Sequence, residues 1–187
     1  MIGLQASDST SFAVDWPLQF AVSGLLLSLA CWTERPRGWA DSDLIEVKES
    51  EVHGRGVFVK ADVPKGTILG TYPGRRRSSA EVMRKVQYAP DTRQYIFHLR
   101  QALYLDPTDQ KGQPSRNPSP GLPWLSIDPS MAYVNEPTPG SSNVNLEIVD
   151  GLDGDVMFRA VQELKKGEEL YIDYGRLYDR STYRKDQ

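Results

Sequence analysis

Short apolar runs separated by Gly, Pro and Asp dominate the chain from Leu44 onward. Runs of this length that are bounded by turn residues are typical of β-strands, because a helix needs a longer amphipathic stretch. The pattern therefore predicts a mainly β fold with short helices, and its expected strands are 44–47, 57–60, 67–72, 95–99, 103–105, 145–149, 156–161 and 170–174.

One helix is expected in the middle of the chain. Ser78 and Glu81 have the Ser-x-x-Glu spacing of a capping box, and Val82, Met83 and Val86 follow. In a capping box each side chain satisfies a backbone N–H of the first turn. The pattern predicts a helix that ends near Tyr88, preceded by Arg75–Arg77 as a solvated turn. A second, weaker helix is expected after Gly175.

Two further segments stand out by composition. Residues 106–130 contain six prolines, which predicts a long loop, and such loops in compact domains are often functional. Residues 16–32 carry no charge and approach the minimum length of a membrane span. A membrane anchor and a packed or partner-binding amphipathic helix are both open for residues 16–32. The predicted organisation is an N-terminal segment and linker at 1–41, one domain at 42–178 and a tail at 179–187.

The overall composition narrows the class of protein. The chain has 187 residues, of which 39% are hydrophobic and 25% charged, so one globular domain of ordinary size is expected. A net charge of −3 offers no general attraction for nucleic acid. The single cysteine, Cys31, excludes an internal disulfide, and two histidines offer little for a metal, so no metal site is predicted.

Gly54-Arg55-Gly56 is the first candidate for ligand binding. The glycines lie directly before a predicted strand, where the lack of a β-carbon lets the backbone approach a ligand closely. A dinucleotide fingerprint is excluded, because its third glycine position holds Val59 and a strand follows in place of a helix. Taken alone, the motif is also compatible with an ordinary glycine-rich turn.

Two later segments place polar groups among apolar residues. Asn135 follows Ala132-Tyr133-Val134, and its amide must find a partner if it is buried. The stretch 167–175, Gly-Glu-Glu-Leu-Tyr-Ile-Asp-Tyr-Gly, joins a turn to an apolar run that ends in Tyr174 and Gly175. An edge strand with aromatic packing would explain the second segment equally well on its own.

Taken in order, these segments resemble the SET-domain protein-lysine methyltransferases over residues 45–174. The matching motifs are Gly54-Arg55-Gly56-Val57-Phe58, Val63-Pro64-Lys65-Gly66, Tyr72-Pro73-Gly74, Tyr95-Ile96-Phe97, Asn135 with Ser142-Asn143, and Gly167 to Gly175. The resemblance implies a β-clip-like SET fold with a knot-like C-terminal threading that brings the Asn135 and Tyr174 segments together. It also implies transfer of a methyl group from S-adenosylmethionine to a lysine of a histone or non-histone protein, in an intracellular location, nuclear or cytoplasmic.

The resemblance assigns roles residue by residue. Tyr174 and Tyr95 match catalytic and channel tyrosines. Gly54, Arg55, Gly56 and Asn135, with Tyr174, match positions that bind the cofactor. The remaining expected channel residues are Phe97, Ile172 and Tyr178.

The chemistry of methyl transfer fits these residue types. The attacking lysine must be neutral although its ordinary pKa is about 10.4, and a dry channel next to a sulfonium cation lowers that pKa. No strong base is then required. A phenol stays neutral, forms hydrogen bonds in both directions and provides a channel wall.

Three departures from the family pattern shape the alternatives. Glu136-Pro137 replaces the family's His-Ser, Ile172 lies where Phe or Tyr is common, and flanking zinc-binding cysteines are absent. Ile172 leads us to expect that multiple methylation is sterically allowed. Glu136 would be costly if buried unpaired, which motivates the alternative of a catalytically inactive SET fold acting as a binding or scaffolding module.

Overall fold

The structure is a computed structural model that describes residues 37–100, 102–118, 126–151 and 154–176, together with Tyr178 and Arg180. The chain divides into two units, Met1–Glu34 and Arg35–Gln187, and every described residue belongs to the second. No helix in this described part is both long and apolar enough to cross a membrane. The predicted anchor or helix at 16–32 lies outside the described residues, as does most of the helix expected after Gly175.

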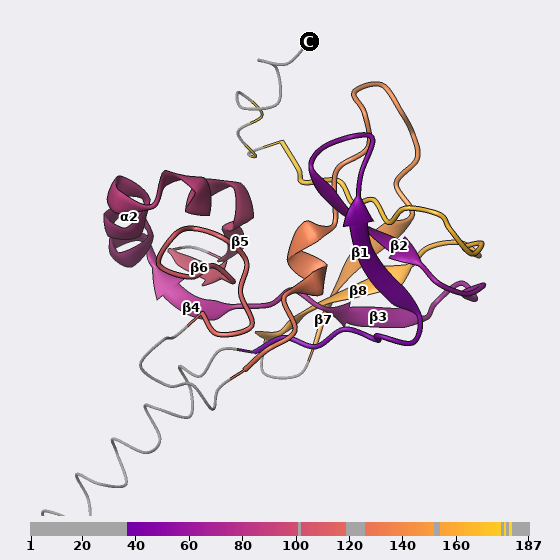
Figure 1. Ribbon diagram of the computed structural model, residues 1–187, viewed down its shortest axis with the longest axis horizontal. Coiled ribbons are helices and arrows are strands. Elements are labelled where there is room, and N and C mark those ends of the chain that lie inside the picture. The colour runs from indigo at the N-terminus through magenta and orange to yellow at the C-terminus, as the bar shows by residue number, and fades with distance from the viewer. Residues whose placement is uncertain are drawn as a thin grey trace, which may run out of the picture. The chain divides into compact units, whose positions relative to one another are not determined.

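Three small antiparallel sheets form the second unit, as the mainly β prediction required (Figure 1). The first pairs β1 (Ile45–Glu49) with β2 (Arg55–Val59). The second has the order β3 (Ile68–Thr71), β8 (Val156–Ala160), β7 (Leu146–Asp150). The third has the order β4 (Arg75–Ser78), β6 (Leu103–Asp106), β5 (Phe97–Arg100).

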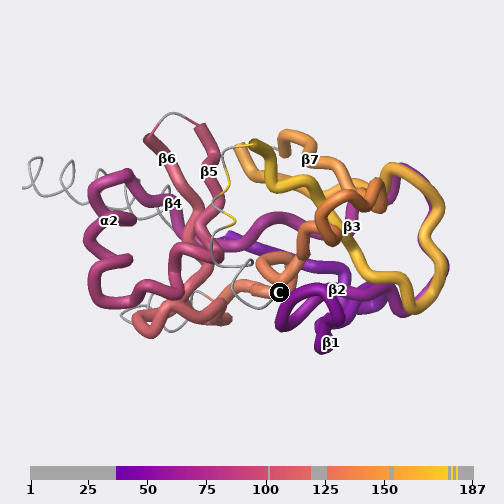
Figure 2. Tube along the Cα trace, turned by 90° about the horizontal axis from the view of Figure 1, so that it is seen from above, coloured from indigo at the N-terminus to yellow at the C-terminus, as the bar shows by residue number. Residues whose placement is uncertain are grey.

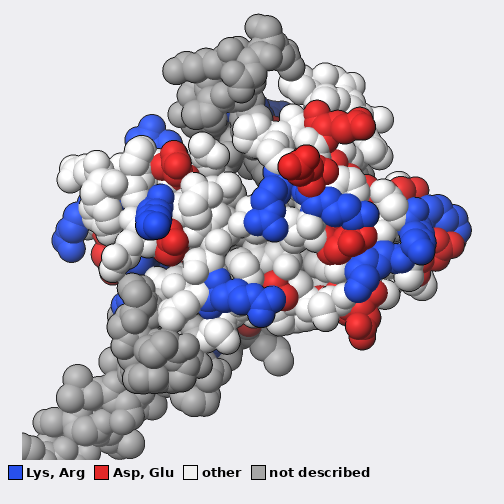
Figure 3. All heavy atoms as spheres, viewed as in Figure 1, with Lys and Arg blue, Asp and Glu red and all other residues white. Residues whose placement is uncertain are grey.

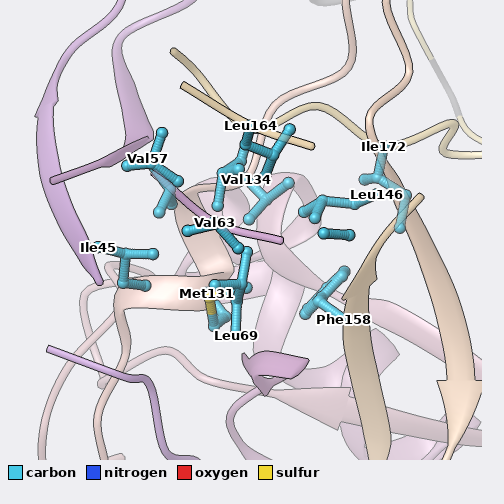
Figure 4. Packing of buried hydrophobic residues seen from close by; sticks show 13 residues of the cluster. Ile45, Val57, Val63, Leu69, Met131, Val134, Leu146, Phe158, Leu164 and Ile172 are labelled. Atoms are coloured by element: carbon cyan, nitrogen blue, oxygen red, sulfur yellow. The ribbon is translucent and has the colours of Figure 1, made fainter. Parts of the chain in front are cut away.

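A hydrophobic core lies among the first two sheets (Figure 4). Val156, Phe158 and Ala160 alternate along β8 and are all buried, since every second side chain of a strand points to the same face. Fully buried leucines come from β3, from β7 and from either side of the turn at 166–167, namely Leu69, Leu146, Leu164 and Leu170. The 3₁₀ helix η2 (Ser130–Tyr133) adds Met131 from the end of the Pro-rich loop.

The third sheet belongs to an insert between β3 and η2. The insert also contains α2 (Ser79–Tyr88) and the 3₁₀ helix η1 (Pro90–Tyr95). In both views α2, β4, β5 and β6 lie to one side of β1, β2, β3 and β7 (Figures 1 and 2). The predicted helix is confirmed, including its capping box between Ser78 and Glu81.

Two local predictions were wrong. Arg75–Arg77 is part of β4 and pairs with β6, because Arg77 Nε reaches the buried carboxylate of Asp106 at 2.6 Å. Residues 170–174 form no strand, because their backbone changes partner along the segment. Leu170 N donates to Val57 O at 2.7 Å, whereas Ile172 N donates to Asn135 O at 3.0 Å.

Tyr95 ends η1 and is not part of a strand, so β5 begins two positions later than predicted. Pro90 accounts for the change, because its fixed φ favours the first turn of a helix. Tyr95 is thereby fixed at the end of a helical turn.

The C-terminal segment lies beside the segment that carries Asn135. Asn135 and Tyr171 form a parallel bridge, so the two stretches that the family resemblance brings together are neighbours here. The knot-like threading of one through the other stays a prediction. Residues 37–40, which precede the predicted domain, also pair with it through bridges to Gly74 and Gly70.

Candidate active site

Five separate segments of the chain surround a pocket of about 290 Å³. They are the residues that open β2, η1, the Pro-rich loop, η2 with the residues after it, and the C-terminal segment. The lining residues are His53, Gly54, Arg55, Gln94, Tyr95, Gln113, Ala132, Tyr133, Asn135, Tyr174 and Tyr178. This lining, as far as the structure describes the chain, contains no carboxylate and no lysine.

Aromatic rings form much of the wall. Tyr95 and Tyr133 meet edge to face with ring centroids 6.1 Å apart, and the rings of Tyr174 and Tyr178 are 4.5 Å apart. The guanidinium of Arg55 lies 4.3 Å from the centre of the Tyr133 ring, within cation–π range. The pocket thus combines apolar faces with phenol hydroxyls and one cation.

Tyr174 is held at both its backbone and its hydroxyl. The hydroxyl donates to Val134 O at 2.7 Å, and the backbone N–H donates to Glu136 Oε1 at 3.2 Å. Both acceptors come from the segment around Asn135. The orientation of the phenol therefore depends on the pairing of these two segments.

Asn135 uses its side chain to hold the glycine motif in place. Its Nδ2 donates to His53 O at 3.2 Å, to Arg55 O at 3.1 Å and to Glu169 Oε1 at 3.0 Å. With 5% of its surface exposed, Asn135 finds partners for its buried amide as expected. The same contacts mean that this amide positions the pocket wall, and direct cofactor contact by Asn135 stays a prediction.

The two glycines of the motif have different environments. Gly54 is exposed on the pocket with φ +50°, and an added β-carbon would meet nothing within 4 Å. At Gly56 an added β-carbon would lie 2.1 Å from Glu169 Oε1. Gly56 therefore makes room for a protein carboxylate, whereas Gly54 leaves open space beside the pocket.

Glu169 packs against Gly56 of the glycine motif and accepts several hydrogen bonds. Besides the amide of Asn135, its carboxylate accepts hydrogen bonds from Ser50 Oγ at 3.0 Å and Tyr171 Oη at 2.8 Å. Burial, and then the hydrogen bond to Glu169, raises the pKa of Tyr171, so this phenol stays protonated. The carboxylate is thus held by three donors and is not part of the pocket lining.

Glu136 is paired, which removes the cost expected of an isolated charge. Arg180 donates to both of its oxygens, from Nε to Oε2 at 2.7 Å and from Nη2 to Oε1 at 2.6 Å. A bidentate arginine–carboxylate pair is a strong arrangement. The replacement of the family's histidine by Glu136 is therefore matched by a partner from the C-terminal segment.

The structure brings six of the predicted site residues together in the pocket: Tyr174, Tyr95, Gly54, Arg55, Asn135 and Tyr178. Three others lie outside its lining. Gly56 faces Glu169, Phe97 packs on Tyr72 with ring centroids 4.9 Å apart, and Ile172 belongs to the hydrophobic core with 6% exposure. Ile172 thus packs in the core, and its role in a substrate channel stays a prediction.

Several pocket residues were not predicted. Tyr133 lies two residues before Asn135 in the Ala132-Tyr133-Val134 run that carries the family motif, which is a signal that the sequence does carry. Gln94 and Gln113 reach the pocket only because the Pro-rich loop folds back onto η1, where Gln113 Nε2 donates to Asp91 Oδ2 at 3.3 Å. Nothing local in the sequence indicates that contact.

Comparison with known proteins identifies the fold. The SET domain family model matches residues 54–175, which is more than half of the chain, so the chain belongs to the SET-domain family. A search of curated protein sequences found no match.

One solved structure with the same fold is a humanized mutant of the Chaetomium thermophilum Polycomb Repressive Complex 2 bound to an inhibitor. It is 20% identical in sequence with a TM-score of 0.50, and the alignment covers 73% of this chain and 15% of that chain. The likeness therefore concerns the fold, and this chain corresponds to a small part of that much longer one. SET-domain methyltransferases as a family use S-adenosylmethionine.

Proposed function

We propose that this SET domain, which we assign to residues 42–178, is an S-adenosylmethionine-dependent protein-lysine N-methyltransferase. The observation that carries the proposal is the placement of Tyr174. Its phenol is fixed by a 2.7 Å hydrogen bond to Val134 O inside a pocket that also contains Gly54, Arg55 and Tyr95.

The pocket residues fit the cofactor. Gly54 leaves open space at the mouth, and the guanidinium of Arg55 offers a partner for a carboxylate, which the amino-acid part of the cofactor carries. The stretch around Asn135 would supply further contacts from its backbone. When bound, S-adenosylmethionine supplies an electrophilic methyl group on a sulfonium sulfur.

The acceptor lysine would lose its proton before the reaction. Contact with the aromatic part of the wall would desolvate the charged amine and so lower the pKa of the substrate lysine. The described lining offers no carboxylate that would hold the lysine protonated. Desolvation therefore does the work that a general base does in other transferases, and the proton leaves to solvent as the amine enters the pocket.

Tyr174 then orients the reacting groups. Because its hydrogen is directed to Val134 O, the phenol oxygen is presented as an acceptor to the amine or to the methyl C–H groups. Tyr95 forms a neighbouring wall, and burial, followed by the nearby Tyr133, raises the pKa of Tyr95 and keeps it neutral. Holding both substrates in line can supply about 7–11 kcal/mol of the barrier.

The proposed substrate is a lysine-bearing protein, histone or non-histone. On the face of Figure 3, side chains of both signs are interspersed. Long-range attraction by one sign of charge therefore gives this face little selectivity, and we propose that selection depends on contacts near Gln94 and Gln113.

The test combines binding and transfer on the full chain. Calorimetry with S-adenosylmethionine should show binding to the parent, and labelled methyl transfer to lysine-rich proteins should show activity. Tyr174→Phe removes only the hydroxyl, and we expect the transfer rate to fall by about 100-fold or more, as for other groups that stabilise a transition state. Mass spectrometry of the product would count the methyl groups added.

Tyr88→Phe is the matched control, because Tyr88 is 64% exposed on α2 and distant from the pocket lining. This variant should transfer at the parent rate. Absence of both binding and transfer in the parent would overturn the proposal and favour the binding or scaffolding alternative. Equal rates in the parent and Tyr174→Phe would remove Tyr174 from the mechanism.

A further inference from the structure

The last described turn of the chain is closed by one side chain. Arg180 Nη2 donates to Gly175 O at 2.9 Å, and Arg180 Nη1 donates to Tyr178 O at 3.2 Å. Its guanidinium thus binds both ends of the turn that carries Tyr178. Among the described residues of this turn, Tyr178 N also donates to Gly175 O, at 3.5 Å.

The same guanidinium fastens this turn to the segment below it. Glu136 receives the bidentate contact from Arg180 at 2.6 and 2.7 Å, and its Oε1 also accepts the backbone N–H of Tyr174 at 3.2 Å. The side chains of Arg180 and Glu136 are 32% and 18% exposed. Because the ion pair is partly buried, dissolved salt screens it less than it would screen a pair on the surface.

Tyr178 contacts both the C-terminal segment and the insert. Its ring packs 4.5 Å from that of Tyr174, and its hydroxyl donates to Gln94 O at 3.3 Å. Gln94 belongs to η1 of the insert. Tyr178 therefore links the C-terminal segment to the insert along one side of the pocket. The hydrogen bonds from Arg180 to Gly175 O and Tyr178 O hold the turn that carries Tyr178.

We propose that Glu136 and Arg180 form a clamp that positions Tyr178 as a wall of the pocket and so controls its affinity for cofactor and its exclusion of water. Neither residue lines the pocket, so both are positioning residues. The inference rests on the proposed function for its catalytic consequence. It also explains how a chain with Glu136 in place of the family's histidine retains an ordered site.

Loss of the clamp has two consequences. The turn loses its attachment, so Tyr178 leaves the pocket wall more often and cofactor binding weakens. Water also enters, which restores part of the hydration of the bound lysine and raises its pKa toward the ordinary value of about 10.4. The rate of methyl transfer should then rise to its plateau at a higher pH.

The experiment uses the full chain with Glu136→Gln, Arg180→Gln, the double variant and Arg176→Gln. The glutamine side chain of the first variant retains one oxygen for the N–H of Tyr174, but it removes the charge and one of the two acceptors for Arg180. Arg176 is an exposed arginine of the same turn outside the pocket lining and is the matched control.

Three measurements follow on these variants. Hydrogen exchange without cofactor should be faster at residues 174–180 in all three clamp variants. Each single variant should raise the Kd for S-adenosylmethionine about five- to tenfold, and the double variant should match the singles because all remove one interaction. The pH at which kcat reaches half its plateau should rise in the clamp variants, because kcat reports the pKa of the bound lysine, and Arg176→Gln should follow the parent throughout.

Additive losses in the double variant, unchanged exchange at residues 174–180, or an equal effect of Arg176→Gln would overturn the clamp. The exchange measurement requires no cofactor. If the parent binds no S-adenosylmethionine, the proposed function fails while exchange still decides whether the clamp exists.

Discussion

On one side of the pocket, the strands β1, β2, β3, β7 and β8 enclose a hydrophobic core, whereas on the other side the insert closes around a buried lysine. The core cluster contains Val57, Leu69, Phe158 and Leu170, all nearly inaccessible to solvent. Among the described residues of the insert between β3 and η2, which are 72–100, 102–118 and 126–129, the buried hydrophobic side chains are Ala89, Leu105 and Ile127.

The insert is held by a polar cluster in place of a large apolar core. Lys85 Nζ donates to Asp106 Oδ2 at 2.7 Å, and to both the carbonyl and the hydroxyl oxygen of Thr108. Thr108 also donates to Asp106 Oδ1 at 2.6 Å. Burial opposes ionisation of Asp106, yet the hydrogen bonds from Lys85 and Thr108 outweigh it and hold its pKa below the ordinary value.

The difference bears on how the pocket is built. Residues of the apolar side supply the glycine motif, Asn135 and Tyr174, while the insert supplies Gln94 and Tyr95. Apolar packing tolerates small adjustments, but a buried polar cluster holds its members in specific directions because each donor needs its acceptor. We infer that the cluster fixes η1, and through η1 the wall that faces Tyr174.

Lys85→Met gives the largest expected effect on this comparison. The variant leaves Arg77 as the cation on the buried carboxylate of Asp106 and takes the ammonium donor from both oxygens of Thr108, and breaking a buried charged cluster in this way costs up to about 3–5 kcal/mol. Urea unfolding should therefore show a strong loss of stability. Native-state hydrogen exchange should show that residues 79–95 open before β8.

Arg84→Met is the control for this prediction, since Arg84 is the exposed neighbour of Lys85 on α2. It should change the free energy of unfolding by at most about 0.5 kcal/mol. If both variants lost a similar free energy of unfolding, the cluster around Lys85 would not be what stabilises the insert.

The sequence pattern predicted elements with local signals better than it predicted long-range pairings. The short apolar run at 156–161 and the capping box at Ser78 are local signals, and the structure confirms both elements. The role of Arg77 depends on Asp106, which is 29 positions away in the chain, so a run of three arginines resembled a solvated turn. Long-range pairing overrode local composition there.

The candidate site shows the same division. Gly54, Asn135 and Tyr174 lie in motifs that the family resemblance aligns, and the structure brings them together in the pocket. Arg180 could not be predicted, because its partner Glu136 is 44 positions away and the tail around it is rich in charge. Gly56 was assigned to the ligand because no local feature distinguishes the two glycines of the motif.

Gly56→Ala and Gly54→Ala sharpen the comparison within the apolar side. The new β-carbon at position 56 would meet Glu169, whose carboxylate Ser50, Asn135 and Tyr171 already hold. Overpacking of this kind costs about 1–3 kcal/mol, which thermal unfolding should show. Gly54→Ala should lower the free energy of unfolding by only about 1–2 kcal/mol, because Gly54 has a positive φ. It should weaken cofactor binding more than Gly56→Ala does. Reversed effects at the two positions would contradict these assignments.

Ser78→Ala gives the smallest effect and tests whether α2 depends on its cap or on Lys85. The Ser78 hydroxyl accepts from Glu81 N at 3.4 Å, and loss of such a cap costs about 1 kcal/mol, well below the loss expected for Lys85→Met. The backbone hydrogen bond from Ser78, ahead of the hydroxyl contact and the nearby Arg77, lowers the pKa of Glu81, so its contribution to stability is present above the ordinary carboxyl pKa and lost as pH falls through the lowered value. Ser78→Ala should raise that pKa, and urea unfolding at pH 7 and at pH 3 should show a smaller difference between variant and parent at the lower pH. A cap effect as large as that of Lys85→Met would mean that the first turn of α2, and not the buried cluster, supports the insert.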